Sequence, residues 1–342
     1  MHALRYFFLL FLALLCGSGA ARAQTTPAAG LLPGQLGVVI NEDDPHSVEV
    51  GEFYRQSRQV PEQNVVRVRI PNRPRKLDAE QFNQLRDQIN AKLGPQVEAV
   101  LMVWTAPYAV ECNSITAAYT LGLDAGICGQ PCGPGKPSKY FNAAISQPYT
   151  QLGMRLSMLL PTDSVQEAKA LINRGIASGF AMPTANAFYL TTSETARNSR
   201  ASLFPPAAVV AARKLTIRRL SADSIENEKN IMFYQTGMAR VDKLETLQFL
   251  PGALADSLTS FGGDLLGSSQ MSSLHWLKSG ATASYGTVSE PCNYWQKFPH
   301  PLVLLRHYLN GATAIEAYWR SVAWPAQGVF IGEPLAAPYR RR

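Results

Sequence analysis

The chain has 342 residues, of which 46% are hydrophobic and 17% charged, a balance typical of globular proteins and not of disordered ones. Its formal net charge is +7, and the basic residues form no stripe with interleaved aromatic residues, which argues against a nucleic-acid-binding protein. Beyond the first 23 residues, no segment has the roughly 20 consecutive apolar residues needed to cross a bilayer.

The first 23 residues have the pattern of an export signal. His2 and Arg5 precede an apolar run over residues 6–15, and Ala-Arg-Ala at 21–23 has the small-x-small form of a cleavage site. Cleavage before Gln24 removes two arginines and no acidic residue, so the net charge falls from +7 to +5. We therefore expect a mature protein in the periplasm or outside the cell.

Four of the five cysteines follow the predicted signal. An even number of cysteines in an oxidising compartment favours disulfide bonds over a metal site. We favour a bond from Cys112 to Cys128 or Cys132, because all three lie in one loop-rich stretch. Three pairings of Cys112, Cys128, Cys132 and Cys292 remain open.

The amino-terminal half predicts alternating strands and helices. Residues 24–34 should be a flexible lead-in. The predicted strands are Leu36–Asn41, residues 65–70 and the continuous apolar run at 99–105. Ser47 is expected to cap a helix that runs to Arg58, and Asp78 with Gln81 predicts a capping box for the next helix. This β-α-β-α-β order predicts a parallel sheet with right-handed crossovers.

Residues 106–150 interrupt this order with a stretch rich in Gly, Pro, Tyr and Cys, which is typical of a functional or disulfide-held loop. The later predicted strands are 155–160, 187–192, 231–235, 247–250, 281–286 and 329–332. The later predicted helices are 164–177, 197–213, 270–279, 302–309 and 313–322. We expect one α/β domain over residues 35–338, with a division near residue 180 as the alternative, and a solvated basic tail over 339–342.

Several of these segments resemble a family of uncharacterised exported bacterial proteins. The resemblance rests on the segments at residues 41–47 (NEDDPHS), 61–65 (PEQNV), 104–108 (WTAPY), 251–263 (PGALADSLTSFGG) and 280–301. It covers most of the mature chain. It implies a fold and an exported location, and it implies no reaction.

The carboxyl-terminal half also resembles caspase-like folds of the gingipain and CHAT type. Residues 231–237 stand where those folds have a strand ending in His-Gly, and residues 258–263 stand where they have the catalytic Cys. Thr236 precedes Gly237 in place of the His, and Ser260 lies near the position of the Cys. The resemblance therefore implies a peptidase-like fold without the thiolate–imidazole pair that such peptidases need.

Polar and aromatic residues follow several predicted strands. Because the carboxyl ends of parallel strands meet at one edge of a sheet, we expect these residues to share a single rim. The predicted rim residues are Asn41, Asp43, Asp44, Trp104, Tyr108, Glu111 and Glu290. Gly262 and Gly263 are expected to serve a backbone of positive φ.

Two chemical interpretations of the rim compete with a purely structural one. Asp256, Ser260 and His300 supply the residue types of an acid–base–nucleophile triad, although no Gly-x-Ser-x-Gly elbow is present. Asp43, Glu290 and His300 supply oxygen and nitrogen ligands for a metal ion. The sequence leaves any cofactor unknown.

The sequence thus favours an exported binding module that holds a peptide or a component of the cell envelope. The alternative is a hydrolase acting on a peptide or ester in the periplasm, through Ser260 or through a metal ion. The missing His before Gly237 favours the binding module.

Overall fold

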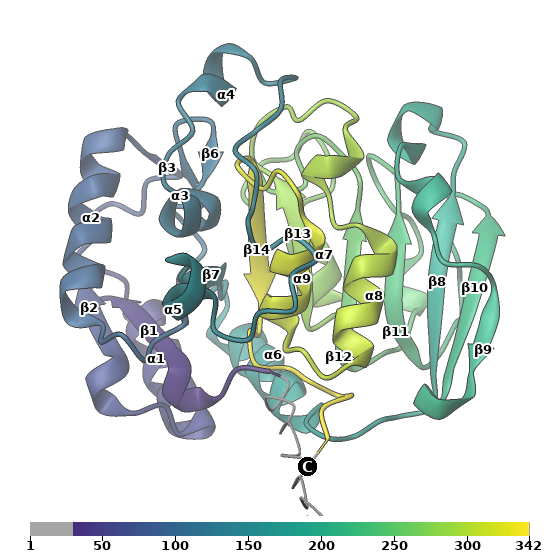
Figure 1. Cartoon of the computed structure of the whole chain (residues 1–342), viewed down its shortest axis with the longest axis horizontal. Helices are drawn as coiled ribbons and strands as arrows, with labels where there is room; N and C mark the ends of the chain where they lie inside the picture. The colour runs from purple at the N-terminus through teal and green to yellow at the C-terminus, as the bar shows by residue number, and fades with distance from the viewer. Residues whose placement is uncertain (1–29, 342) are drawn as a thin grey trace, which may run out of the picture.

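The computed structural model describes residues 30–341, and the predicted signal peptide lies outside these residues. Their main feature is an 11-stranded sheet in the order β2-β1-β4-β7-β14-β13-β12-β11-β8-β10-β9, and β3, β5 and β6 form a second, three-stranded sheet. Figure 1 shows helices α8 and α9 in front of the large sheet and α6 behind it. The mixed, mostly parallel α/β class predicted from the sequence is confirmed.

The strands of the first half are those that were expected from their apolar runs. They are β1 (Leu36–Asn41), β2 (Val65–Val68), β4 (Ala99–Val103) and β7 (Leu156–Leu159), with the short strands β3 (Lys76–Leu77), β5 (Ala109–Val110) and β6 (Asn113–Ser114) between them. Every residue of β1 and β4 is buried. Continuous burial is what a parallel strand covered on both faces requires.

The strands of the second half are longer and less regular. They are β8 (Ala185–Thr191), β9 (Ala208–Val210), β10 (Leu215–Ser221), β11 (Ile231–Thr236), β12 (Phe249–Ser257), β13 (Ala283–Thr287) and β14 (Gly328–Gly332). The strand expected at 247–250 is only the beginning of β12. The helix expected at 197–213 is wrong: its place is taken by short 3-10 turns and by the edge strand β9.

Helices cover both faces of the large sheet. They are α1 (Pro45–Arg58), α2 (Ala79–Lys92), α3 (Ile115–Leu121), α4 (Gly126–Gly129), α5 (Pro148–Leu152), α6 (Val165–Ala177), α7 (Leu274–Lys278), α8 (Pro301–Leu309) and α9 (Ala314–Ser321). No helix within residues 30–341 is long and apolar enough to cross a membrane.

Helix caps explain where several of these helices begin. The capping box of Asp78 and Gln81 is present at α2, and Ser164 caps α6 as predicted. The predicted cap of α1 was wrong: Asp44 accepts a hydrogen bond from the His46 amide and begins the helix three residues earlier than Ser47. The Ser47 hydroxyl accepts instead from the Asn41 amide, 2.9 Å away.

A direction change divides the large sheet. β14 runs parallel to β7 but antiparallel to β13, and β13 runs parallel to β12. The strands β2, β1, β4, β7 and β14 therefore point one way, and the strands from β13 to β10 point the other way. One continuous sheet thus has two parallel blocks joined at the β13–β14 seam.

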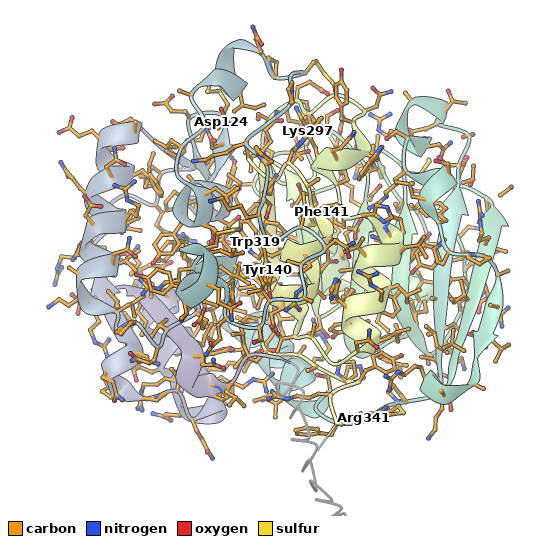
Figure 2. The ribbon with its side chains drawn as sticks, viewed as in Figure 1. Asp124, Tyr140, Phe141, Lys297, Trp319 and Arg341 are labelled. Atoms are coloured by element: carbon orange, nitrogen blue, oxygen red, sulfur yellow. A yellow bond between two sulfur atoms is a disulfide. The ribbon has the colours of Figure 1, made fainter. Side chains whose placement is uncertain are left out.

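The core continues through both blocks. The Trp319 ring stacks on Phe330 with centroids 4.3 Å apart, and its Nε1 donates to the Ser157 carbonyl at 2.9 Å. Figure 2 places Trp319 and Tyr140 near the middle of the molecule. The predicted solvated tail is wrong at Tyr339, which is buried, and Arg340 donates to the Leu31 carbonyl at 3.2 Å. The end of the chain and the lead-in at Leu31 are therefore packed together.

Candidate functional site

The predicted common rim does not exist, because the two blocks of the sheet point in opposite directions. Asn41 ends β1 and Trp104 follows β4, both in the first block. Asp256 lies in β12 and Glu290 follows β13, both in the second block. Their carboxyl ends therefore lie at opposite edges of the sheet, and the residues form two groups.

The first-block residues hold turns. Asn41 bonds the backbone of Ile70 in both directions, accepting at 2.9 Å and donating at 3.1 Å. Asp43 forms an ion pair with Arg69 at 3.0 Å. Trp104 is fully buried, and its Nε1 donates to a backbone carbonyl at Pro107. With Asp44 capping α1, these side chains all have structural partners.

The segment after β4 reaches the second-block edge. The Tyr108 hydroxyl donates to the Asp264 carboxylate at 2.5 Å, and burial is the main cause that raises the Tyr108 pKa. The Cys112 carbonyl accepts from the Ser289 hydroxyl at 2.6 Å. Glu111 lies exposed between them in sequence. The predicted rim residue Tyr108 and the disulfide candidate Cys112 thus contact the edge that carries Ser260 and Glu290.

The candidate site is a cavity of about 310 Å³ at this second-block edge. It brings together three predicted residues, Ser260, Glu290 and Cys292. Its complete lining is Ala196, Arg197, Leu258, Thr259, Ser260, Glu290, Cys292, Asn293 and Phe298. Sequence reasoning missed Ala196 and Arg197, which lie in a 3-10 turn after β8: Arg197 was expected to begin the helix at 197–213, and Ala196 was assigned no role.

Hydrogen bonds fix the polar wall of this cavity. The Thr259 hydroxyl donates to Gln270 Oε1 at 2.5 Å and accepts from Arg197 Nε at 3.2 Å. Arg197 is also paired with Glu194, so its charge is compensated. The Ser260 carbonyl accepts from the Thr287 hydroxyl at 2.8 Å. Within residues 30–341 the Ser260 hydroxyl has no hydrogen-bond partner, and it is therefore available to a ligand.

Glycines set how closely the loop after β12 approaches β13. A Cβ atom at Gly263 would lie 2.5 Å from the Gly286 carbonyl oxygen, closer than van der Waals contact allows. Gly262 and Gly263 are not among the positive-φ residues, so their predicted reason was wrong. Gly263 serves close backbone packing, which glycine permits because it has no side chain, whereas a Cβ atom at Gly262 would make only ordinary contacts.

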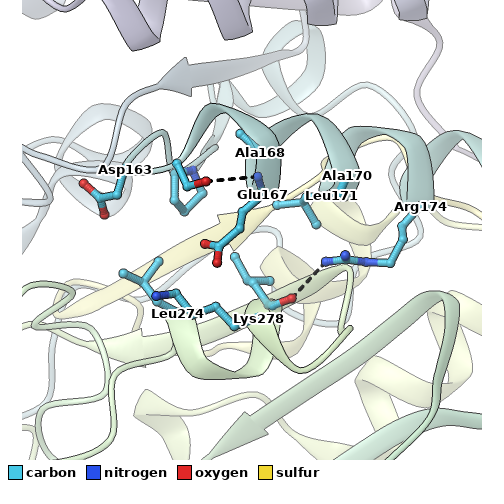
Figure 3. A pocket seen from close by; sticks show the side chains of 11 residues that line it. Asp163, Glu167, Ala168, Ala170, Leu171, Arg174, Leu274 and Lys278 are labelled. Atoms are coloured by element: carbon cyan, nitrogen blue, oxygen red, sulfur yellow. Dashed lines mark hydrogen bonds between the residues drawn. The ribbon is translucent and has the colours of Figure 1, made fainter. Parts of the chain in front are cut away.

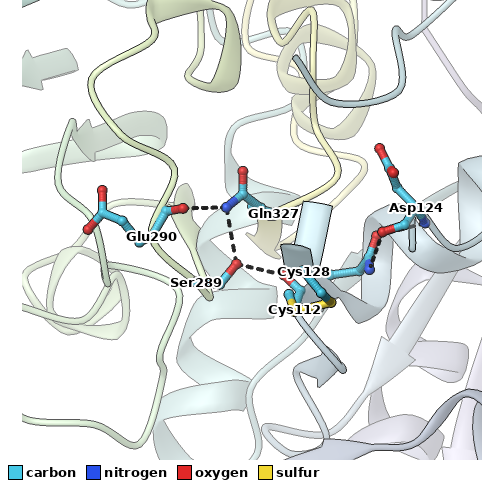
Figure 4. The surroundings of a disulfide bond; sticks show 7 residues. Cys112, Asp124, Cys128, Ser289, Glu290 and Gln327 are labelled. Atoms are coloured by element: carbon cyan, nitrogen blue, oxygen red, sulfur yellow. Dashed lines mark hydrogen bonds between the residues drawn. A yellow bond between two sulfur atoms is a disulfide. The ribbon is translucent and has the colours of Figure 1, made fainter. Parts of the chain in front are cut away.

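Two disulfides connect the segments beside the cavity. Cys112 bonds to Cys128, and Cys132 bonds to Cys292, with Cα atoms 5.3 Å apart in each pair. Cys112 was predicted to bond to Cys128 or Cys132, and the structure has the first of these two bonds. Figure 4 shows the first bond beside Ser289, Glu290 and Gln327. Gln327 donates to the Glu290 carbonyl at 2.6 Å, and the Cys292 amide donates to the Glu290 carboxylate at 2.7 Å.

The predicted triad is not assembled. The Asp256 carboxylate is fully buried and paired with Arg200, and burial raises its pKa against the opposing attraction of that guanidinium. The His300 ring lies against Trp295 and Phe141, and its buried Nδ1 has no partner. No hydrogen bond joins Asp256, Ser260 and His300 within the described chain.

The predicted metal ligands are also dispersed. Asp43 is paired with Arg69 in the first block, whereas Glu290 lines the second-block cavity and His300 lies among aromatic rings. Over residues 30–341, no group of three His, Cys, Asp or Glu residues has the arrangement of a metal site.

A buried lysine, Lys297, lies next in sequence to the cavity residue Phe298. Lys297 is 1% exposed, and its ammonium group donates to the Pro131 carbonyl at 2.5 Å. Burial lowers the pKa of Lys297 to about 8, although Asp124 and Glu290 oppose this shift. Figure 2 shows Lys297 and Asp124 toward the top of the molecule. The lysine thus ties the Cys132 loop to the segment that follows Glu290.

Comparison with known proteins adds a likeness of fold. No protein-family model and no curated protein matches the chain, so membership of an exported bacterial family stays a prediction. Among solved structures, the chain is similar to the Arg-specific cysteine proteinase gingipain R, with 12% identity over 91% of this chain and 79% of that chain and a TM-score of 0.46. It is also similar to the complex of the pro- and mature domains of Porphyromonas gingivalis RgpB, with 11% identity over 89% and 79% and a TM-score of 0.43.

Both of these structures are of gingipain R. Because both TM-scores are below 0.5, the likeness assigns neither a fold family nor a residue role to this chain. The class of protein defined by the structure is a mixed α/β protein with a large, mostly parallel sheet flanked by helices.

Proposed function

We propose that the protein is an exported binding module that holds an extended peptide at the cavity between Ser260 and Glu290. The exported location is supported by the signal pattern of the sequence and by the two disulfides, which persist in oxidising compartments. The peptide carries a cationic side chain, and the Glu290 carboxylate receives it.

The observation that carries this proposal is that the Glu290 carboxylate lines the cavity without a direct ion pair, although the buried Lys297 ammonium also interacts with it electrostatically. The carboxylate accepts one hydrogen bond, from the Cys292 amide, and forms no ion pair within the described chain. Arg197, the cation in the lining, is already paired with Glu194. The cavity therefore offers a carboxylate without a direct ion-pair partner beside the apolar surfaces of Leu258 and Phe298, which suits the head and stem of a lysine or arginine side chain.

Binding without cleavage follows from the side chains near Ser260. A nucleophilic hydroxyl needs an adjacent general base, and no described side chain accepts its proton. Thr236 and Gly237, which stand where the caspase-like folds have His-Gly, supply no base either. Thr236 is fully buried, and a side chain at Gly237 would collide with the Arg197 carbonyl. Cys292 is held in a disulfide and offers no thiolate.

The test uses labelled heptapeptides that differ only at a central Arg, Lys, norleucine or Glu, with binding followed by fluorescence anisotropy. The Arg and Lys peptides should bind, and Glu290→Gln should weaken them about tenfold or more, because hydrogen bonds to charged groups contribute roughly 1.5–3 kcal/mol. Glu245→Gln, a change at an exposed acid, is the matched control. Equal binding of all four peptides would contradict the proposal.

The same peptides distinguish the hydrolase alternative. After long incubation with the wild-type protein, mass spectrometry should find them intact. Cleavage that disappears in Ser260→Ala would replace the binding module with a hydrolase.

A further inference from the structure

A second cavity of about 210 Å³ lies between α6 and α7, away from the cavity at Ser260. Figure 3 shows the two helices on either side of it. α6 follows the first-block strand β7, and α7 precedes the second-block strand β13, so the cavity spans the two blocks of the sheet. Leu171, Leu274 and Leu277 give it an apolar surface.

Arg174 is the unusual residue of this cavity. Its Nη2 donates to two carbonyl oxygens, of Leu277 and Ala281, both at 2.9 Å. Its Nε is buried without a hydrogen-bond partner, and its Nη1 makes no hydrogen bond to the described residues. Burial lowers the pKa of Arg174, and no carboxylate acts against this shift. A half-buried guanidinium without a counter-ion is costly, because charged groups lose hydration on burial.

The acidic residues of the lining do not supply that counter-ion. Asp163 is paired with Arg73 at 3.2 Å. Glu167 is exposed and lies seven residues before Arg174 on α6, about 10 Å along the helix axis at 1.5 Å per residue. Lys278 adds a second, exposed cation from α7. The Arg174 guanidinium therefore has no carboxylate partner among the described residues, and apolar side chains lie beside it.

We propose that this cavity binds a small carboxylate with an apolar tail. The carboxylate is held by Arg174 Nη1, and the tail lies against Leu171, Leu274 and Leu277. Charge-assisted hydrogen bonds of this kind are stronger than neutral ones, and apolar contact adds affinity in proportion to the surface removed from water. Because the lining comes from both blocks of the sheet, the bound carboxylate links α6 to α7.

The experiment is a ligand-detected NMR titration of the full mature chain with hexanoate, hexan-1-ol and hexylamine. Hexanoate should show saturable binding that is at least about tenfold tighter than that of the alcohol or the amine. Arg174→Gln should abolish the preference for the carboxylate, and Arg240→Gln, a change at an exposed arginine, should preserve it.

A second variant avoids the structural bonds of Arg174. Ala170 is exposed on α6 and lines the cavity, so Ala170→Phe fills the space while leaving Arg174 unchanged. It should remove hexanoate binding without unfolding the protein. Equal binding of the three six-carbon probes, or unchanged hexanoate binding in Ala170→Phe, would overturn the proposal.

Discussion

Arg200 and Asp256 form an ion pair in which Nη1 and Oδ1 lie 2.5 Å apart and both side chains are 1% exposed. Arg200 also donates to the Thr236 carbonyl at 2.8 Å and the Pro299 carbonyl at 3.2 Å, and Asp256 accepts from Gln235 at 2.9 Å. The pair therefore joins the carboxyl ends of β11 and β12 to the segment before α8. It explains why Asp256, four residues before Ser260, does not line the cavity.

Removing either partner of this pair should destabilise the fold. Arg200→Met leaves the buried Asp256 charge without a counter-ion, which typically costs about 3–5 kcal/mol. Urea unfolding should show this loss, and the double variant Arg200→Met/Asp256→Leu should recover much of it. A single variant as stable as the wild type would show that the pair is not needed.

The two disulfides should stabilise the protein unequally. They close segments with sequence separations of 160 residues for Cys132–Cys292 and 16 for Cys112–Cys128. The chain-entropy model predicts roughly 2 kcal/mol more stabilisation from the longer one, because the loss of unfolded-state entropy grows with the logarithm of loop length. Comparing urea unfolding of Cys132→Ala/Cys292→Ala with Cys112→Ala/Cys128→Ala measures this difference, and the reverse order would contradict the prediction.

The contact between the Gly263 backbone and β13 should tolerate no side chain at residue 263. Gly263→Ala places a methyl group against the Gly286 carbonyl oxygen, and overpacking of this kind typically costs about 1–3 kcal/mol. Thermal unfolding should show the loss together with weaker peptide binding, since Ser260 lies in the same loop. Gly34→Ala is the control, because a Cβ there has no neighbour within 4 Å. Equal melting temperatures for the two variants would disprove the close contact.

Lys297 should make stability depend on pH in the alkaline range. Its pKa is about 8 in the folded protein, below the ordinary value of 10.5. Between these values the unfolded chain binds more protons than the folded one, so the contribution of this group to stability rises as pH increases from about 8 to 10.5. The difference in unfolding free energy between wild type and Lys297→Met, measured at pH 7, 8, 9 and 10, should shift in favour of the wild type as pH rises. A constant difference would mean that the lysine titrates normally.

The elements predicted best are those with a local physical cause. The apolar run of β1, the capping box of Asp78 and the cap at Ser164 each lie within a few residues of the structure that they determine. Such signals need no knowledge of distant contacts.

The failures have nonlocal causes. The alanine-rich stretch 207–212 favours a helix by intrinsic propensity, yet it forms the edge strand β9 against β10. The strand β10 was not predicted at all, because the sequence analysis assigned no helix or strand to its residues. The shared rim failed for a different reason: the position of β14 between β7 and β13 reverses the sheet, and no local pattern records the neighbours of a strand.

Part of the candidate site was nevertheless predictable. Ser260, Glu290 and Cys292 follow β12 and β13, and parallel neighbours bring such residues together. Arg197 follows β8, which is separated from β12 by β11 in the sheet. It was not predicted as a site residue, because it was assigned to the incorrect helix at 197–213. The unpaired Arg174 could not be foreseen, because its lack of a counter-ion becomes visible only when every neighbouring carboxylate has been placed.

The disulfide between Cys132 and Cys292 has a consequence for the integrity of the molecule. Cys132 belongs to the segment that leaves the first block, whereas Cys292 lines the cavity of the second block. A fragment beginning after residue 180 would keep Ser260 and Glu290 but would lose this covalent anchor, as well as the Tyr108 bond to Asp264. The Cys132–Cys292 bond therefore joins the lining of the cavity, which comes from the second half of the chain, covalently to the first half.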